Sequence, residues 1–209
     1  MDLPVWQALH EELAPLGFTV VTVALDRSAE DARPWIEQAR PSRPGMEHPS
    51  LIDTEFRIAD LYGMVNVPTV VWIDEAGRIV RPNDVAFATD TYRHITHMDA
   101  AKSLGAIRAW VRGETRPPDA ATVRAWQALP TAEHQQARAE FGLARWLYAH
   151  GLPEAAKGHF AQAEALAPHD WTIRRGSMPM RDMDPFGPDF RTRRTEWVNA
   201  GHPYYLPLE

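Results

Sequence analysis

Residues 65 to 80 read VNVPTVVWIDEAGRIV. The β-branched run from Thr69 to Ile73 is typical of a buried strand, and a glycine-containing turn and a second extended run follow it. This order predicts an antiparallel hairpin. Pro68 stands directly before the first strand, although proline cannot donate a hydrogen bond to a neighbouring strand. Two interpretations follow. The donor-free nitrogen could face a site, with a cis Val67–Pro68 bond that bends the chain sharply before Thr69, or a trans proline could merely begin the strand.

Helices and strands alternate on both sides of this hairpin. Apolar residues at helical spacing predict the helices, and continuous β-branched runs predict buried parallel strands. This alternation predicts a mostly parallel sheet covered by helices, with an antiparallel hairpin at its edge. The expected elements are a helix at 3–16, a strand at 18–25, a helix from Ser28 to about Arg40, a short extended piece at 50–53, a helix at 54–62, a strand at 69–73 and a helix at 100–111, after a loop at 82–99.

The segment VNVPTVVWIDEAGRIV resembles the cis-proline hairpin of the thioredoxin superfamily, in the form found in TlpA/ResA-type thiol-disulfide oxidoreductases and peroxiredoxin-like redoxins. DTEFRIADLYGMVNVP resembles the family's approach to that proline, and LPVWQALHEELAPLGFTVVTVALD resembles its first helix and second strand, so the resemblance covers residues 2 to 112. It implies a thioredoxin-like α/β sandwich. It also implies that Val67, Pro68 and Thr69 form the groove in which an extended substrate backbone pairs.

The family's chemistry requires a cysteine thiolate at the N-terminus of the first helix, where the helix dipole lowers the thiol pKa. The chain contains no cysteine. Family members carry a proline a few residues after the motif, and Pro4 matches it. The redox motif and the strand before it are therefore expected just upstream of Met1. Three explanations remain open: an upstream selenocysteine codon read as a stop, a mis-assigned start with an ordinary cysteine, and a shortened, redox-inactive relative.

The family's fold places the strand before the motif in the centre of the sheet, between residues 18–25 and 69–73. Without it, two buried strands would have unpaired edges, and each buried unpaired backbone group costs roughly 1–3 kcal/mol. We therefore expect the chain to be an N-terminally incomplete domain without a catalytic residue of its own. Direct pairing of residues 18–25 with 69–73 would overturn this hypothesis.

Residues 137 to 170 resemble one tetratricopeptide repeat, a helical hairpin of 34 residues. The matching positions are Leu143, Ala144, Ala156, Phe160, Ala163 and Pro168, and the departures are Glu140 and Leu147. A single repeat favours a hairpin docked on the redoxin domain, although a peptide-binding role stays open. We expect three parts: a redoxin domain at 1–115, a helical appendage at 116–170 and an irregular, extended tail at 171–209.

The sequence gives weaker evidence for a functional role of other polar residues. His94 and His97 could ligate a metal, but two ligands do not define a site, and we expect no metal. Asp26, Asp74 and Glu75 lie at strand ends and are expected to cap turns. The arginines of RTRR at 191–194 could bind an anion, and we expect them to be solvated or paired with acids.

The formal charge of −6 argues against a nucleic-acid partner. No apolar run is long enough to cross a bilayer, no export signal is evident, and nothing indicates a cofactor. The resemblance implies a redoxin-class oxidoreductase acting on a disulfide or peroxide, with its cysteine or selenocysteine outside this chain. The alternative is a redox-inactive scaffold that binds proteins through the groove and the helical hairpin. The compartment stays open.

Overall fold

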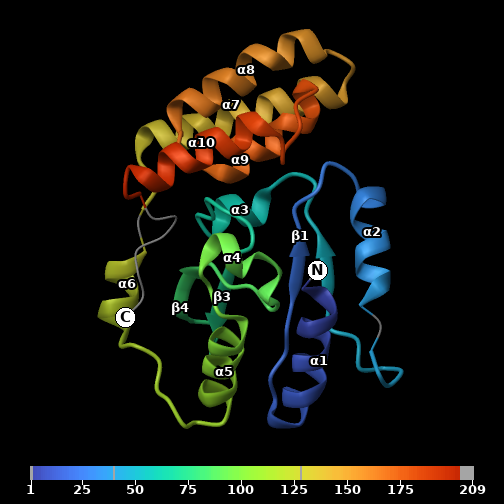
Figure 1. Cartoon of the computed structure of the whole chain (residues 1–209), viewed down its shortest axis with the longest axis vertical. Coiled ribbons are helices and arrows are strands. Elements are labelled where there is room, and N and C mark those ends of the chain that lie inside the picture. Colours follow the sequence, from blue (N-terminus) through green and yellow to red (C-terminus); the bar gives the residue numbers. More distant parts are fainter. Residues whose placement is uncertain (1, 40, 128, 203–209) are drawn as a thin grey trace. The chain divides into compact units, whose positions relative to one another are not determined.

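The structure is a computed structural model that describes residues 2–39, 41–127 and 129–202. It is mixed α/β and mainly helical, with two small sheets (Figure 1). Its contacts divide the chain into two compact units. The first contains residues 1–56, 70–81 and 86–123, and the second contains residues 57–69, 82–85 and 124–209.

The first unit begins with the predicted helix, seen as α1 (Leu3–Leu13) and a 3₁₀ turn, η1 (Ala14–Leu16). Gly17 ends it in the left-handed conformation, with φ 82°. Ser28 caps α2 (Ala29–Gln38), because its hydroxyl accepts a hydrogen bond from the Asp31 N–H. Arg40, at the predicted end of this helix, lies outside the described residues.

Two separate two-stranded sheets follow. Strand β1 (Thr22–Ala24) pairs in parallel with β2 (Ser50–Ile52), with Val23 opposite Leu51. Strand β3 (Val70–Ile73) pairs with β4 (Ile79–Asp84). Only five residues connect β3 to β4, too few for the crossover that parallel strands need, so this pair is the predicted antiparallel hairpin. In the described part of the chain, no strand pairing joins the two sheets.

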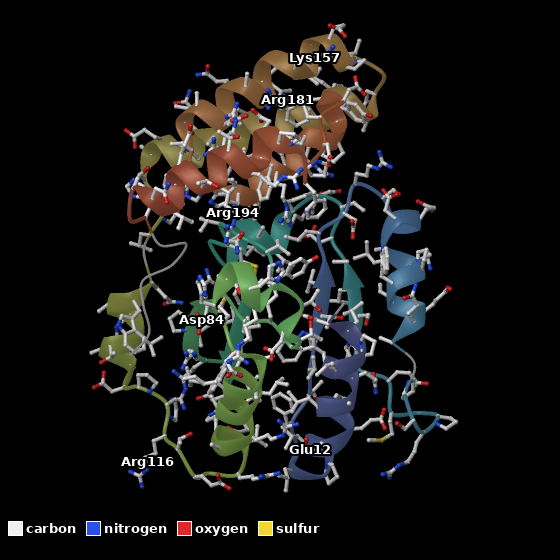
Figure 2. All side chains as sticks on the ribbon, viewed as in Figure 1. Glu12, Asp84, Arg116, Lys157, Arg181 and Arg194 are labelled. Carbon is white, nitrogen blue, oxygen red and sulfur yellow. The ribbon has the colours of Figure 1, made fainter. Side chains whose placement is uncertain are left out.

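The core of the first unit lies between α1 and α5 (Ala100–Val111), where Leu9, Leu13, Leu104 and Ile107 are buried together. Between β4 and α5, the predicted loop contains η2 (Asp90–Tyr92) and α4 (Arg93–Thr96). Glu12 of α1 lies on the surface (Figure 2). It accepts hydrogen bonds of 2.7–2.9 Å from Arg108 of α5 and one of 3.1 Å from Arg112.

Aromatic rings extend this core. The indole of Trp72 on β3 stacks on that of Trp110 on α5, with centroids 4.9 Å apart and planes 21° apart. Phe18 meets Trp110 edge-on, and the Arg81 guanidinium lies 5.1 Å from the Trp72 ring centre. The hairpin is thereby attached to α5 through side chains.

The second unit is helical. Small residues allow α7 (Ala132–Ala149) and α8 (Pro153–Leu166) to pack closely, and Phe141 and Phe160 fill the space between them with ring centres 5.9 Å apart. The unit also contains α3 (Arg57–Leu61), α9 (Trp171–Ser177), the 3₁₀ turn η3 (Met178–Arg181) and α10 (Pro188–Asn199). Helix α6 (Ala120–Trp126) crosses the boundary between the units.

The predicted irregular, extended tail at 171–209 is wrong for its described part. Residues 171–181 and 188–199 are helical. Asp170 caps α9, and Trp171 and Ile173 are buried, so tertiary packing holds a segment that lacks a helical apolar pattern. Residues 203–209 lie outside the described residues.

The two long strands were also predicted to be more buried than they are. Strand β1 covers only 22–24 of the predicted 18–25, and its residues are half-buried. Val21 is 55% exposed and Ile73, at the end of β3, is 43% exposed. In the part of the chain that the structure describes, each sheet has two strands, so a neighbouring strand covers one edge of each.

Candidate functional site

The candidate site is the segment Val67–Pro68–Thr69, directly before β3. The Val67–Pro68 peptide bond is cis. Val67 is 41% exposed, whereas Pro68 and Thr69 are half-buried and Asn66 is buried. The Thr69 hydroxyl donates a hydrogen bond of 2.7 Å to the Asn66 carbonyl and so closes the bend. The segment therefore exposes one residue on a backbone that is fixed at both ends.

The loop before this segment has its carbonyl groups taken by donors from elsewhere in the second unit. The side-chain amide of Asn83 donates to the carbonyls of Tyr62 (2.7 Å) and Gly63 (3.1 Å). The Met64 carbonyl accepts a hydrogen bond of 2.6 Å from the Arg138 guanidinium. The Val65 carbonyl accepts one of 2.7 Å from the backbone N–H of Trp171. The carbonyls of residues 62–65 follow α3 and belong to no helix, so these bonds supply the partners that backbone carbonyls need.

Arg138 belongs to a buried ionic cluster. Its Nη2 lies 2.5 Å from Oδ2 of Asp170, and its Nε forms an ion pair of 3.1 Å with Asp60 of α3. The same Oδ2 accepts a hydrogen bond of 2.8 Å from Nε2 of His134. The Asp170 side chain is 0% exposed. Burial of a charged carboxylate is unfavourable, and the contacts with Arg138 and His134 compensate for this cost.

The other oxygen of Asp170 caps α9. Its Oδ1 accepts hydrogen bonds from the N–H groups of Thr172 (2.9 Å) and Ile173 (3.2 Å) and from the Thr172 hydroxyl (2.6 Å). Burial raises the pKa of Asp170, but the hydrogen bond from His134 and the charge of Arg138 outweigh it and hold the pKa below its usual value. Burial, together with the neighbouring His134, lowers the pKa of His169.

The second feature of interest is the pair of open strand edges in the first unit. In the parallel ladder, the Thr22 N–H donates to the Pro49 carbonyl and the Ala24 carbonyl accepts from the Asp53 N–H. Thr22 and Ala24 thus face β2, and because backbone groups alternate along a strand, the N–H and C=O of Val23 point to the opposite edge. No strand in the described part of the chain pairs with that edge, nor with the edge of β3 opposite β4.

A second buried polar cluster joins α1 to the starts of β1 and β2. Nδ1 of His48 lies 2.6 Å from Oε1 of Gln7, and its Nε2 lies 3.1 Å from the Thr22 hydroxyl and 3.3 Å from that of Ser50. Because an amide oxygen only accepts, Nδ1 carries the proton and Nε2 accepts from a hydroxyl. Burial and the nearby His10 lower the pKa of His48. The imidazole is a structural connection here.

The carboxylates expected to cap turns divide into two kinds. Asp74 closes the turn between β3 and β4, because its carboxylate accepts from the N–H groups of Ala76 (3.0 Å) and Arg78 (2.9 Å), as predicted. Hydrogen bonds from Arg78 lower the pKa of Asp74. Asp26 differs: burial, with the charge of Asp31, raises its pKa. Glu75 is exposed in the turn.

The predicted histidine and arginine candidates lie on or directly after α4 and on α10. His94 lies on α4 and His97 ends it with φ 59°, and both side chains are exposed. Arg193 pairs with Glu164 and with Asp189, as expected for acid-paired arginines. Arg181 joins Arg193 at Glu164, at 2.8 Å.

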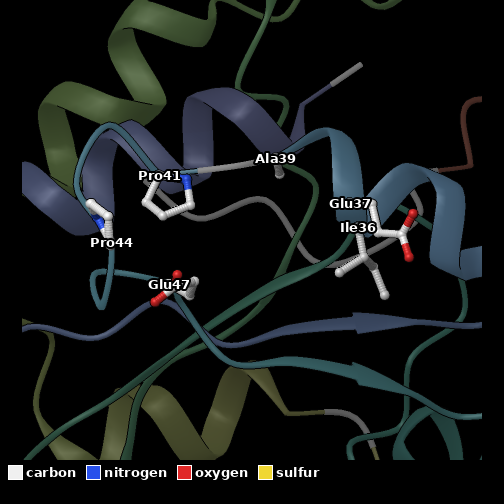
Figure 3. A pocket seen from close by; sticks show the side chains of 6 residues that line it. All are labelled: Ile36, Glu37, Ala39, Pro41, Pro44 and Glu47. Carbon is white, nitrogen blue, oxygen red and sulfur yellow. The ribbon is translucent and has the colours of Figure 1, made fainter.

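Three further findings concern metal sites, membrane spans and surface hollows. Among the described residues, no group of three or more histidine, aspartate or glutamate side chains is placed to hold a metal ion. No helix in that part of the chain is long and apolar enough to span a bilayer. A shallow, mostly apolar hollow beside α2 brings together no acid–base pair (Figure 3); it is lined by Ile36, Glu37, Ala39, Pro41, Pro44 and Glu47.

Sequence reasoning missed Arg138 and Asp170. The only available signal for Asp170 was its position as a potential N-cap before Trp171, and nothing in the sequence links Arg138 to the loop 74 residues earlier. Comparison with protein-family models, with curated proteins and with solved structures finds no match for this chain.

Proposed function

We propose that this chain is a thioredoxin-like domain of the redoxin class, whose nucleophilic thiol or selenol is carried by an extended segment outside these 209 residues. The observation that carries the proposal is the separation of β1–β2 from β3–β4. Among the strands that the structure describes, each pair leaves unpaired the edge at which the resemblance implies a central strand. A strand placed there would pair with the Val23 backbone on one side and with β3 on the other.

The proposed chemistry divides between the missing segment and this chain. The segment supplies the thiolate or selenolate that attacks a disulfide or peroxide. The N-terminal end of α1 supplies the positive dipole that keeps this nucleophile ionised. By the resemblance, the segment around Val67, which is 41% exposed, would offer its backbone to an extended substrate. The 209 residues alone hold no cysteine and are expected to catalyse neither reaction.

The second candidate is a redox-inactive scaffold that binds proteins. The observation that favours it is the outward face of α7, where Leu143 and Trp146 are 44% and 54% exposed. Exposed apolar side chains on one helix face are typical of contact surfaces. In this reading, the groove and the helical hairpin bind partners without exchange chemistry.

One experiment separates the candidates. The reading frame before the Met1 codon is translated, and the longer chain is expressed and assayed for dithiol-dependent reduction of insulin disulfides. The redoxin proposal expects a strand and an in-frame cysteine or UGA codon, activity in the longer chain, and none in its serine variant or in the 209-residue chain.

Two results would count against the redoxin proposal. An in-frame stop with no preceding strand would favour the binding scaffold. Insulin reduction by the 209-residue chain itself would refute an external nucleophile.

A further inference from the structure

Helices α7 and α9 contact the loop before Val67 at two consecutive carbonyls. Arg138, on the first helix of the hairpin, donates to the Met64 carbonyl, and the Trp171 N–H donates to the Val65 carbonyl. Both bonds are short, at 2.6 and 2.7 Å, and all four residues belong to the second unit. Helices α7 and α9 thus contact the residues that determine the path of the chain into the candidate site.

The Arg138 guanidinium is itself held from three elements. It lies on α7, its Nη2 contacts Asp170 at the start of α9, and its Nε faces Asp60 on α3. Because Asp170 is fully buried and also caps α9, it cannot follow a moving arginine without leaving four other donors unpaired. The position of Nη2, and hence of the Met64 carbonyl, is therefore fixed by the fold of the helices.

We propose that Arg138 is a positioning residue for the Val67–Thr69 segment and that α7 and α9 together act as a brace for this segment. The role in substrate recognition rests on the proposed function above. An extended partner that pairs with the Val67 backbone binds best when that backbone is ordered beforehand, because ordering it on binding costs affinity. Asp170 aligns Arg138, and the Trp171 N–H fixes the adjacent carbonyl.

The brace is tested by hydrogen–deuterium exchange on the full 209-residue chain. The N–H groups of Tyr62, Gly63 and Met64 bond to carbonyls of α3 and report opening of the loop. Arg138→Met removes a hydrogen bond from a charged donor. The exchange rates of these three N–H groups should therefore rise about tenfold in this variant. Arg191→Met, an exposed arginine of α10 in the same unit, is the matched control and should leave exchange unchanged.

A second variant keeps the test decisive if Arg138→Met fails to fold. Arg138→Lys retains a positive charge for Asp170, but its single ammonium cannot reach Asp170, Asp60 and the Met64 carbonyl together. Its exchange should rise in residues 62–70 while α8 keeps wild-type protection. Wild-type exchange in residues 62–70 of a folded variant, or an equal rise there and in α8, would overturn the brace.

The substrate role has a separate readout. In an insulin-reducing longer chain, Arg138→Lys should raise KM severalfold and leave kcat unchanged, because the nucleophile is untouched. An unchanged KM would overturn the positioning role. The hydrogen–deuterium exchange measurement needs neither a ligand nor enzymatic activity. A longer chain without activity would therefore count against the proposed function and not against the brace.

Discussion

Replacement of Asp170 by alanine should destabilise the second unit more than any other single loss of a carboxylate. The change removes the N-cap of α9, which costs about 1 kcal/mol. It also leaves the guanidinium of Arg138, 11% exposed, without its buried counter-ion, and the loss of one partner of such a pair costs about 3–5 kcal/mol. The expected loss is therefore about 4–6 kcal/mol, close to the whole stability of a small domain.

The assay is urea unfolding at pH 7 followed by far-UV circular dichroism. Asp99→Ala is the matched control, because Asp99 also caps a helix, accepting from the Ala101 and Lys102 N–H groups, but is 37% exposed. It should cost about 1 kcal/mol. Asp170→Asn keeps an acceptor for the cap and should lose about 3 kcal/mol, from the uncompensated charge alone. If Asp170→Ala cost no more than Asp99→Ala, the buried pair would contribute nothing and the reasoning would fail.

The contribution of Asp170 to stability should also depend on pH in a defined direction. The folded pKa of Asp170 lies below its ordinary 3.8, so the unfolded chain binds the proton first. The stabilisation by Asp170 is complete above the pKa that this residue has in the unfolded chain. It is lost as the pH falls through the pKa that it has in the folded chain. The difference in stability between the wild type and Asp170→Asn should therefore stay constant from pH 7 to 5 and shrink below about pH 4.

Three further predictions concern other contacts. Phe160→Ala should cost about 3–5 kcal/mol in urea unfolding, because a fully buried ring is lost between α7 and α8; a loss below about 1 kcal/mol would mean that the hairpin closes over the cavity. Burial keeps the pKa of His48 below 6.5, so protonation favours the unfolded chain, and the stability advantage of the wild type over His48→Gln should narrow as the pH falls below 6.5; a constant difference from pH 7 to 5 would contradict this. Glu12→Gln breaks a partly exposed surface network with Arg108 and should cost less than about 1 kcal/mol, with the loss diminishing in 1 M salt; a larger, salt-independent loss would refute a screened surface pair.

Helix boundaries could be predicted because local chemistry sets them. Ser28 caps α2 through its own hydroxyl, and Gly17 ends the first helix with a positive φ, so both positions are readable from neighbouring residues. The hairpin of β3 and β4 followed in the same way from its short turn, which Asp74 closes.

What could not be predicted depends on residues distant in sequence. Strand β1 begins only at Thr22, where β2 starts to oppose it, and no property of residues 18–21 reveals that limit. Helix α9 forms because Asp170 is anchored by Arg138 and His134 on another helix. The candidate segment at Val67 was identifiable from its own pattern, whereas the side chains that hold its approach loop become visible only in three dimensions.

The stacked indoles of Trp72 and Trp110 make the first unit its own optical probe. Two chromophores at 4.9 Å and 21° couple excitonically and give a split circular-dichroism band, which disappears once the rings separate. In the helical unit, Trp171 and Trp197 are 6.5 Å apart at 82°, a nearly perpendicular geometry with a different spectral contribution. A single thermal scan at two wavelengths would thus follow the melting of each unit without a label.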